Sequence, residues 1–243
     1  TDTRNERSMR VAERLGFKPE AVLRRATLGS SGEPADQAHF GLLREEHAAT
    51  ALRSPGATPQ KRFSLVVDDE LELAIPERED AEAISALAER NVEQLLPWMP
   101  WARSISPAAQ REFIVNRALP ALQQGDGFEA MILERGELVG GAGIHDVSPE
   151  RRRGQIGYWL DAERYGHGVV TRTARAILAR SFESDSCAGN PFERMEIRAD
   201  ARNLRSRAVA ERLGFTFEGV LRRDTFHGAG YGDMAVYGLL RQE

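Results

Sequence analysis

Apolar residues recur along this chain at two spacings, every third or fourth position in some segments and every second position in others. The first spacing is that of an amphipathic helix, whereas the second, or a short continuous apolar run, indicates a strand. Helical spacing occupies residues 79–96, 107–124 and 171–182. Strands are predicted at residues 64–75, 128–134, 138–146, 154–161 and 194–199. This order is not a regular βαβ alternation, and it predicts an α/β (α+β) fold in which helices cover a mixed sheet.

The two ends of the chain carry one pattern twice. Residues 2–28 align with residues 200–226, and 18 of the 27 aligned positions are identical, where average composition would give about two. Each copy is predicted to be a short helix that ends at a glycine, a strand, a glycine-rich loop and a second strand. The predicted helices are 7–15 and 205–213, and the predicted strands are 20–25, 37–43, 218–223 and 234–240.

The repeat predicts the domain organisation. The second copy is preceded by enough chain to complete a domain, which we expect to span residues 63–243. Residues 1–46 are expected to be the C-terminal part of a preceding domain whose front half is absent, and residues 47–62, rich in Pro, Gly and small side chains, a linker. A two-stranded unit is marginal alone, so we expect residues 1–46 to pack on the complete domain or on a second chain, as in a homodimer.

Composition excludes several classes of protein. The chain is 41% hydrophobic and 29% charged, as is typical of a globular protein. Its net charge of −4 argues against nucleic-acid binding. No apolar run approaches a membrane span, the N-terminus is no signal peptide, and one cysteine, Cys187, allows no internal disulfide, so we expect a cytoplasmic protein with no membrane partner. The five histidines lack zinc spacing, so no metal is expected.

The strand at 154–161 leads into the turn Gly166-His167-Gly168 and then a helix. The amides at a helix N-terminus have no internal partners and carry a partial positive charge, so such a turn can bind phosphate. The turn lacks the Lys-Ser/Thr of an ATPase phosphate loop, and Gly141-x-Gly143 lacks the third glycine of a dinucleotide site. Glycines in such turns also serve simply to permit positive φ, which is the alternative interpretation.

Taken together, these motifs resemble the GNAT superfamily of N-acetyltransferases, and within it the RimJ/RimL type that acetylates the N-termini of ribosomal proteins. The resemblance spans residues 63–243 in the expected order. The residues that carry it are Ile156-Gly157-Tyr158-Trp159-Leu160-Asp161, Gly166-His167-Gly168, Asn203-x-x-Ser206-x-x-Val209, Gly214-Phe215, Gly230-Tyr231-Gly232-Asp233 and Leu96-Pro97-Trp98-Met99-Pro100-Trp101.

The resemblance implies a mostly antiparallel sheet in which two central strands splay apart, with acetyl-CoA as cosubstrate. The pantetheine arm is expected in the splay and the pyrophosphate at the glycine turn. The residues implied in cofactor binding are Trp159, Leu160, Asp161, Arg164, Gly166, His167, Gly168, Val169, Val170, Thr171, Asn203, Arg205 and Ser206. Glu163 stands where the family usually has Gln or Arg, so the phosphates are expected to depend on the amides and on Arg164, Arg172 or Arg205.

The expected chemistry is direct attack of a neutral amine on the thioester in a ternary complex, with a backbone N–H at the oxyanion. Ser206 matches the position proposed to protonate the leaving thiolate, although serine is also favoured in a first helical turn. Candidate bases are Asp224 and His145, with Thr225 at the aligned site of the family's Glu. Trp98, Trp101 and Tyr231 are assigned to the acceptor cleft, where core packing is the alternative.

Three functions stay open at this point. The chain acetylates an N-terminal α-amine of a protein or peptide, which is the interpretation that the resemblance favours. It acetylates a small amine, such as an aminoglycoside, a polyamine or an amino acid. Or it binds acetyl-CoA without catalysis, which Glu163 and the missing Glu favour.

Overall fold

The computed structural model describes residues 3–14, 17–28, 33–41, 64–183, 190–226 and 230–242. The chain divides into two compact units, Thr1–Lys61 and Arg62–Glu243, and each is described here by itself. The predicted linker at 47–62 and Cys187 lie outside the described residues. The interpretation of residues 1–46 as part of a preceding domain stays a prediction.

The first unit consists of helix α1 (Glu6–Arg14) and the antiparallel strands β1 (Lys18–Leu28) and β2 (Pro34–Gly41). The second unit ends in the same three elements, and the likeness extends to individual hydrogen bonds. The donor–acceptor pairs that recur at aligned positions are Ser8–Asn5 and Ser206–Asn203, Thr3–Asp36 and Ala201–Asp233, and Phe17–Ala12 and Phe215–Ala210. Phe17 is nevertheless 37% exposed, whereas Phe215 is 5% exposed.

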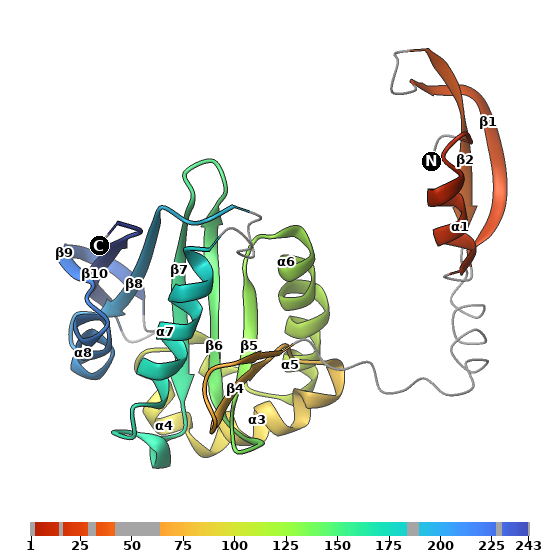
Figure 1. Ribbon diagram of the computed structural model, residues 1–243. Helices are drawn as coiled ribbons and strands as arrows, with labels where there is room; N and C mark the ends of the chain where they lie inside the picture. Colours follow the sequence, from red (N-terminus) through yellow and green to blue (C-terminus); the bar gives the residue numbers. More distant parts are fainter. Residues whose placement is uncertain are drawn as a thin grey trace. The chain divides into compact units, whose positions relative to one another are not determined.

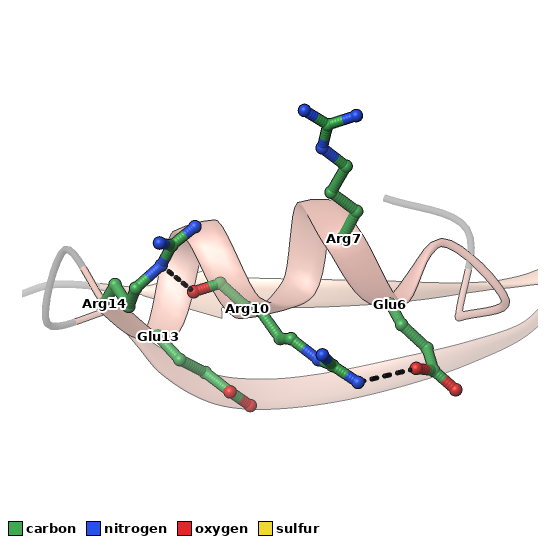
Figure 2. Close-up of a pocket in the computed structure, with 5 residues that line it drawn as sticks. All are labelled: Glu6, Arg7, Arg10, Glu13 and Arg14. Atoms are coloured by element: carbon green, nitrogen blue, oxygen red, sulfur yellow. Dashed lines mark hydrogen bonds and ion pairs between the residues drawn. The ribbon is translucent and has the colours of Figure 1, made fainter.

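Charged side chains line the surface of α1 (Figure 2). Arg10 pairs with Glu6 at 3.0 Å, and Arg14 donates to the Arg10 carbonyl at 3.3 Å. All of these side chains are exposed. Exposed pairs one helical turn apart contribute only about 0.3–0.5 kcal/mol, so this surface favours the helix without forming a buried site.

The second unit is built on one eight-stranded sheet with the order β3-β4-β5-β6-β7-β8-β10-β9 (Figure 1). All neighbours are antiparallel except β7 and β8, which are parallel. The strands are β3 (Ser64–Val66), β4 (Leu71–Ala74), β5 (Phe128–Glu134), β6 (Glu137–Ser148), β7 (Arg153–Leu160), β8 (Arg194–Asp200), β9 (Thr216–Phe226) and β10 (Tyr231–Leu240). The predicted fold class, a mixed and mostly antiparallel sheet with helices, is confirmed.

Helices cover both faces of this sheet. The helices are η1 (Arg78–Asp80), α3 (Ala81–Arg90), α4 (Val92–Leu95), η2 (Pro100–Arg103), α5 (Pro107–Phe113), η3 (Ile114–Ala118), α6 (Leu119–Gln124), η4 (Ala162–Arg164), α7 (Val169–Ser181) and α8 (Leu204–Arg212). Helix α7 runs along β6 and β7 and buries Ala174 and Ile177 against Ile144 and Ile156 (Figure 1). On the other face, α3 and η3 pack against Met131.

Three predicted elements are subdivided in the structure, and one of them is the helix predicted at 79–96, which is divided into η1, α3 and α4. The strand predicted at 64–75 is a hairpin, because the Asp68 carboxylate accepts the N–H groups of Glu70 and Leu71 and turns the chain between β3 and β4. The helix predicted at 107–124 contains the π-helical segment η3, in which Leu119 N–H donates to the Ile114 carbonyl. Pro120 has no N–H to donate in an α-helical hydrogen bond, which accounts for the change from α-helix to π-helix at this place.

Candidate active site

Strands β7 and β8 separate at the centre of the sheet. They pair only at Arg153↔Arg194, Gly154↔Met195 and Gln155↔Glu196, and both strands continue beyond this point. From Ile156 onward β7 pairs with β6 alone, which leaves an opening between β7 and β8. The splay expected from the resemblance is therefore present, at the expected strands.

Backbone alternation decides which peptide groups face this opening. Asp161 N–H donates to the Val139 carbonyl at 2.8 Å, and the register between β6 and β7 is continuous over this stretch. Because alternate residues of an antiparallel strand turn their peptide groups to opposite sides, Trp159 also faces β6. The N–H and C=O groups of Tyr158 and Leu160 therefore face the splay. This corrects the expected backbone contacts, since Trp159 and the Asp161 amide are used within the sheet.

The turn after η4 has the geometry of an anion site. Gly166 and Gly168 have φ of 84° and 75°, and Gly168 is the N-cap of the 13-residue helix α7. The helix begins two residues earlier than predicted, so Val169, Val170 and Thr171 form its first turn. Their amides are among the donors that an α-helix leaves without internal acceptors.

Of the three cations expected near this turn, two are already paired. Arg164 lies 3.3 Å from Glu134 and 2.9 Å from Glu137. Arg172 lies 3.0 Å from Asp68 and 3.2 Å from a Glu70 oxygen. Both arginines are therefore held by carboxylates in this structure, and their contribution to phosphate binding stays a prediction.

The third cation, Arg205, stacks on the ring of Tyr165, with its guanidinium carbon 4.7 Å from the ring centroid. Tyr165 immediately precedes Gly166, so this contact holds the guanidinium beside the glycine turn. Among the described residues, Arg205 has no carboxylate partner. Of the three arginines, Arg205 is therefore the one that lies beside the turn without an ion pair to a described carboxylate.

The start of α8 places two polar side chains at the splay. Asn203 caps the helix, and its Oδ1 accepts the Ser206 N–H at 3.1 Å. The Ser206 hydroxyl lies 2.9 Å from the Tyr158 hydroxyl, which also donates to the Ser206 carbonyl at 3.2 Å. Burial raises the pKa of Tyr158 to about 12, against the lowering effect of its hydrogen bond with Ser206. The phenol therefore stays protonated and holds the serine hydroxyl in place.

A cleft of about 620 Å³ joins the splay to the face of the sheet that α3 and η3 cover. Its lining includes Trp98, Trp101, Trp159, Asn203 and Ser206. The Trp101 and Trp159 rings meet edge to face at 5.8 Å, and Trp101 is 42% exposed. The loop of Trp98 and Trp101 thus forms one wall of the cleft. That this wall contacts the acceptor stays a prediction.

Comparisons with known proteins identify the family of this chain. The acetyltransferase (GNAT) domain family matches residues 70–216. The putative ribosomal N-acetyltransferase YdaF of Bacillus subtilis is 31% identical over 182 residues, which cover 74% of this chain and 97% of YdaF. The chain belongs to the GNAT acetyltransferase family. The expected family and its acetyl-CoA-dependent N-acetyltransferase chemistry are thereby confirmed.

Two further proteins are similar over nearly their whole lengths. The ribosomal-protein-serine acetyltransferase of Escherichia coli is 25% identical over 174 residues, which cover 72% of this chain and 94% of that enzyme. The solved structure of RimL, a ribosomal-protein α-N-acetyltransferase in complex with coenzyme A, superposes with a TM-score of 0.68. It is 23% identical, and the match covers 73% of this chain and 98% of RimL. The latter likeness shows the GNAT fold.

Among the residues predicted for acceptor binding or base catalysis in this GNAT chain, Tyr231 and Asp224 lie outside the cleft lining. Tyr231 is 63% exposed, and its ring packs against Phe226 at 5.3 Å and under the guanidinium of Arg223. Asp224 is exposed on β9. Both belong to the β9–β10 hairpin, in which Met234 of β10 does line the cleft. The assignment of Tyr231 to acceptor binding and of Asp224 to base catalysis stays a prediction.

His145, the other candidate base, does line the cleft. Its Nδ1 lies 3.2 Å from an Asp146 carboxylate oxygen, and its side chain is 45% exposed. Its Nε2 occupies the space above Gly157, 2.8 Å from where a Cβ would be. The missing side chain at Gly157 thus makes room for the imidazole.

Glu129, a partly buried carboxylate of the same cleft, is not among the residues predicted from the sequence. Burial raises the pKa of Glu129 to about 7, although the positive charge of Arg117 opposes the shift. Its Oε2 lies 2.9 Å from where a Cβ on Gly143 would be. The signal in the sequence is one acidic residue inside the apolar strand Phe128–Glu134, facing a strand rich in glycine.

Two further findings concern the described residues as a whole. No group of three or more His, Cys, Asp and Glu side chains within the described ranges could hold a metal ion. No described helix is long and apolar enough to cross a membrane.

Proposed function

We propose that this chain transfers the acetyl group of acetyl-CoA to the N-terminal α-amine of a protein or peptide, as its ribosomal-protein acetyltransferase relatives are named for doing. The observation that carries the proposal is the continuous cleft from the splay to the loop of Trp98 and Trp101. It joins the place for the thioester to an open aromatic wall for an acceptor. An α-amine has a reference pKa of about 7.7–8.0, so a useful fraction is neutral near pH 7.

In this proposal the pyrophosphate binds at the turn of Gly166 and Gly168, beside Arg205. The pantetheine arm lies in the splay and bonds to the free peptide groups of Leu160 and Tyr158. The Asn203 amide nitrogen supplies a further donor, because its oxygen caps α8. Acetyl-CoA binding would therefore use mainly backbone groups. This explains why an acid, Glu163, can stand where the family usually has Gln or Arg.

The proposed reaction forms one carbon–nitrogen bond and breaks one carbon–sulfur bond. The neutral amine attacks the thioester carbonyl carbon, and a β7 N–H that faces the splay stabilises the oxyanion. The carbon–sulfur bond then breaks, the amine nitrogen gives one of its two protons to solvent, and the thiolate takes a proton from the Ser206 hydroxyl, which solvent reprotonates. Tyr158 holds that hydroxyl in position at 2.9 Å.

The test is an acceptor panel with purified protein. Release of the CoA thiol is measured with peptides that begin with Ser or Ala, and with a polyamine, an aminoglycoside and free amino acids. Matched peptides with a blocked N-terminus are the control, and mass spectrometry locates the acetyl group. We expect turnover on the free peptides alone. Faster turnover of the small amines would contradict the peptide assignment, and acetyl-CoA binding without any turnover would indicate a non-catalytic module.

A further inference from the structure

Glu129 belongs to a row of three residues that crosses the centre of the sheet. It pairs with Gly143 on β6, and Gly143 pairs with Gly157 on β7. Residues directly opposite one another share a face of the sheet. The only side chain that this row carries into the cleft is therefore the carboxylate of Glu129.

His145 fills the space above Gly157, whereas Gly143 leaves room for the Glu129 carboxylate. Its Oε2 lies over Gly143, so it is displaced by one strand from its own backbone towards β7. Neighbouring strands are about 4.8 Å apart, so the carboxylate lies about one strand spacing from the row of β7. A base can act at hydrogen-bond distance or through one water molecule, and this separation suits the second route.

The carboxylate is also without a partner. Among the described residues, Glu129 makes no hydrogen bond and no ion pair. Arg117 is the charge that acts on it most clearly, at longer range. The titratable and charged groups that line the cleft beside it are Arg117, His145, Asp146, Tyr158, Arg198 and Asp200. Arg198 is bonded to Glu196, Asp200 to Arg202, and His145 to Asp146.

We propose that Glu129 is the general base that deprotonates the acceptor amine, directly or through one water molecule. The step balances as a proton transfer from the acceptor ammonium to the Glu129 carboxylate, which yields the neutral amine and a neutral carboxyl group. The amine then attacks the thioester, and Glu129 returns its proton to solvent after product release. The proposal rests on the proposed acetyltransferase function and assigns its missing base.

The carboxylate suits this task in two ways. A general base works best when its pKa lies near the working pH, and burial brings Glu129 there. His145 is the rival, since it lines the same cleft. Its imidazole is more exposed and already bonded to Asp146, whereas Glu129 has its oxygens free for a substrate.

The experiment compares pH profiles of kcat for Glu129→Gln, Glu129→Asp, His145→Gln and the wild type, with the best acceptor of the panel at saturation. Glu112→Gln is the matched control, because Glu112 is an exposed acid on α5 that does not line the cleft. Acetyl-CoA binding by calorimetry is measured for every variant. It shows that each variant folds and binds the cosubstrate.

For Glu129→Gln we expect a loss of about 10²- to 10⁴-fold in kcat at pH 7, with acetyl-CoA affinity within about twofold of the wild type. The wild-type profile should rise with an apparent pKa near 7, and the residual activity of Glu129→Gln should keep rising above pH 8. Glu129→Asp should show the same rise of kcat with pH as the wild type, at a lower rate.

Three results would overturn the assignment. An unchanged profile in Glu129→Gln would show that this carboxylate is not the base. Loss of the pH 7 limb in His145→Gln alone would assign the base to His145. If the wild type binds acetyl-CoA but acetylates no amine, the proposed function itself fails, and the base assignment fails with it.

Discussion

The raised pKa of Glu129 makes a prediction about stability that does not depend on any substrate. A carboxyl group whose pKa is higher in the folded state than in the unfolded state binds more protons when folded. Folding stability therefore falls as the pH rises from the ordinary value of 4.5 to about 7. Glu129→Gln removes this titration, so the variant should gain stability relative to the wild type across this range.

The magnitude follows from the size of the shift. One pKa unit corresponds to about 1.4 kcal/mol, so a shift from 4.5 to about 7 gives an upper bound of about 3.5 kcal/mol. Because the carboxylate is only partly buried, solvent screening reduces this figure, and we expect about 1–2 kcal/mol.

The assay is urea unfolding of both proteins at pH 5.0, 6.0, 7.0 and 8.0. The free energy of unfolding of Glu129→Gln, minus that of the wild type, should increase with pH up to about 7.5 and then level off. Glu112→Gln should show a difference that does not change with pH. A flat difference for Glu129→Gln would mean that Glu129 titrates normally, and it would refute the reasoning about its burial.

Three further predictions concern binding, proton donation and the first unit. Arg205→Ala should weaken acetyl-CoA binding about fivefold to tenfold, whereas Arg164→Ala, whose cation is already paired, should change it less than twofold by calorimetry. Ser206→Ala should lower kcat at pH 7 about tenfold to a hundredfold, and Tyr158→Phe about fivefold, the equivalent of about 1 kcal/mol. The double variant should be no slower than Ser206→Ala. Deletion of residues 1–60 should leave kcat within twofold, measured as CoA release.

Each of these has a result that contradicts it. Equal losses in Arg205→Ala and Arg164→Ala would show that the ion pairs of Arg164 open when the cofactor binds. Additive effects of Ser206→Ala and Tyr158→Phe would mean that the two hydroxyls act separately. Loss of both folding and activity on deletion of residues 1–60 would mean that the first unit is integral to the domain.

Local sequence patterns predict much of the fold. The helix of α7 and the strand of β7 follow from apolar periodicity, and the turn at Gly166 and Gly168 follows from the positive φ that only glycine adopts freely. The capped start of α8 is also local, since Asn203 bonds an amide three residues away. Short-range hydrogen bonds and backbone sterics act between neighbours in sequence, so the motif itself reveals them.

The composition of the catalytic cleft was decided by tertiary structure. The register of three strands brings Glu129 over Gly143, and no spacing in the sequence records that contact. Pairing of Arg164 and Arg172 with acids from distant strands leaves Arg205 as the cation of the turn. Likewise, the course of the β9–β10 hairpin brings Met234 to the cleft and leaves Tyr231 outside its lining.

The sequence by itself therefore determined the family, the glycine turn and the aromatic loop, because each depends on a contiguous motif whose geometry is local. Only the tertiary structure decided which peptide groups of β7 face the splay. It also decided which arginine and which partly buried carboxylate have no ion-pair partner among the residues that the structure describes. These depend on strand register and burial. Both arise from contacts between residues far apart in the chain, and it is burial that moves the pKa of Glu129 into the range of a base.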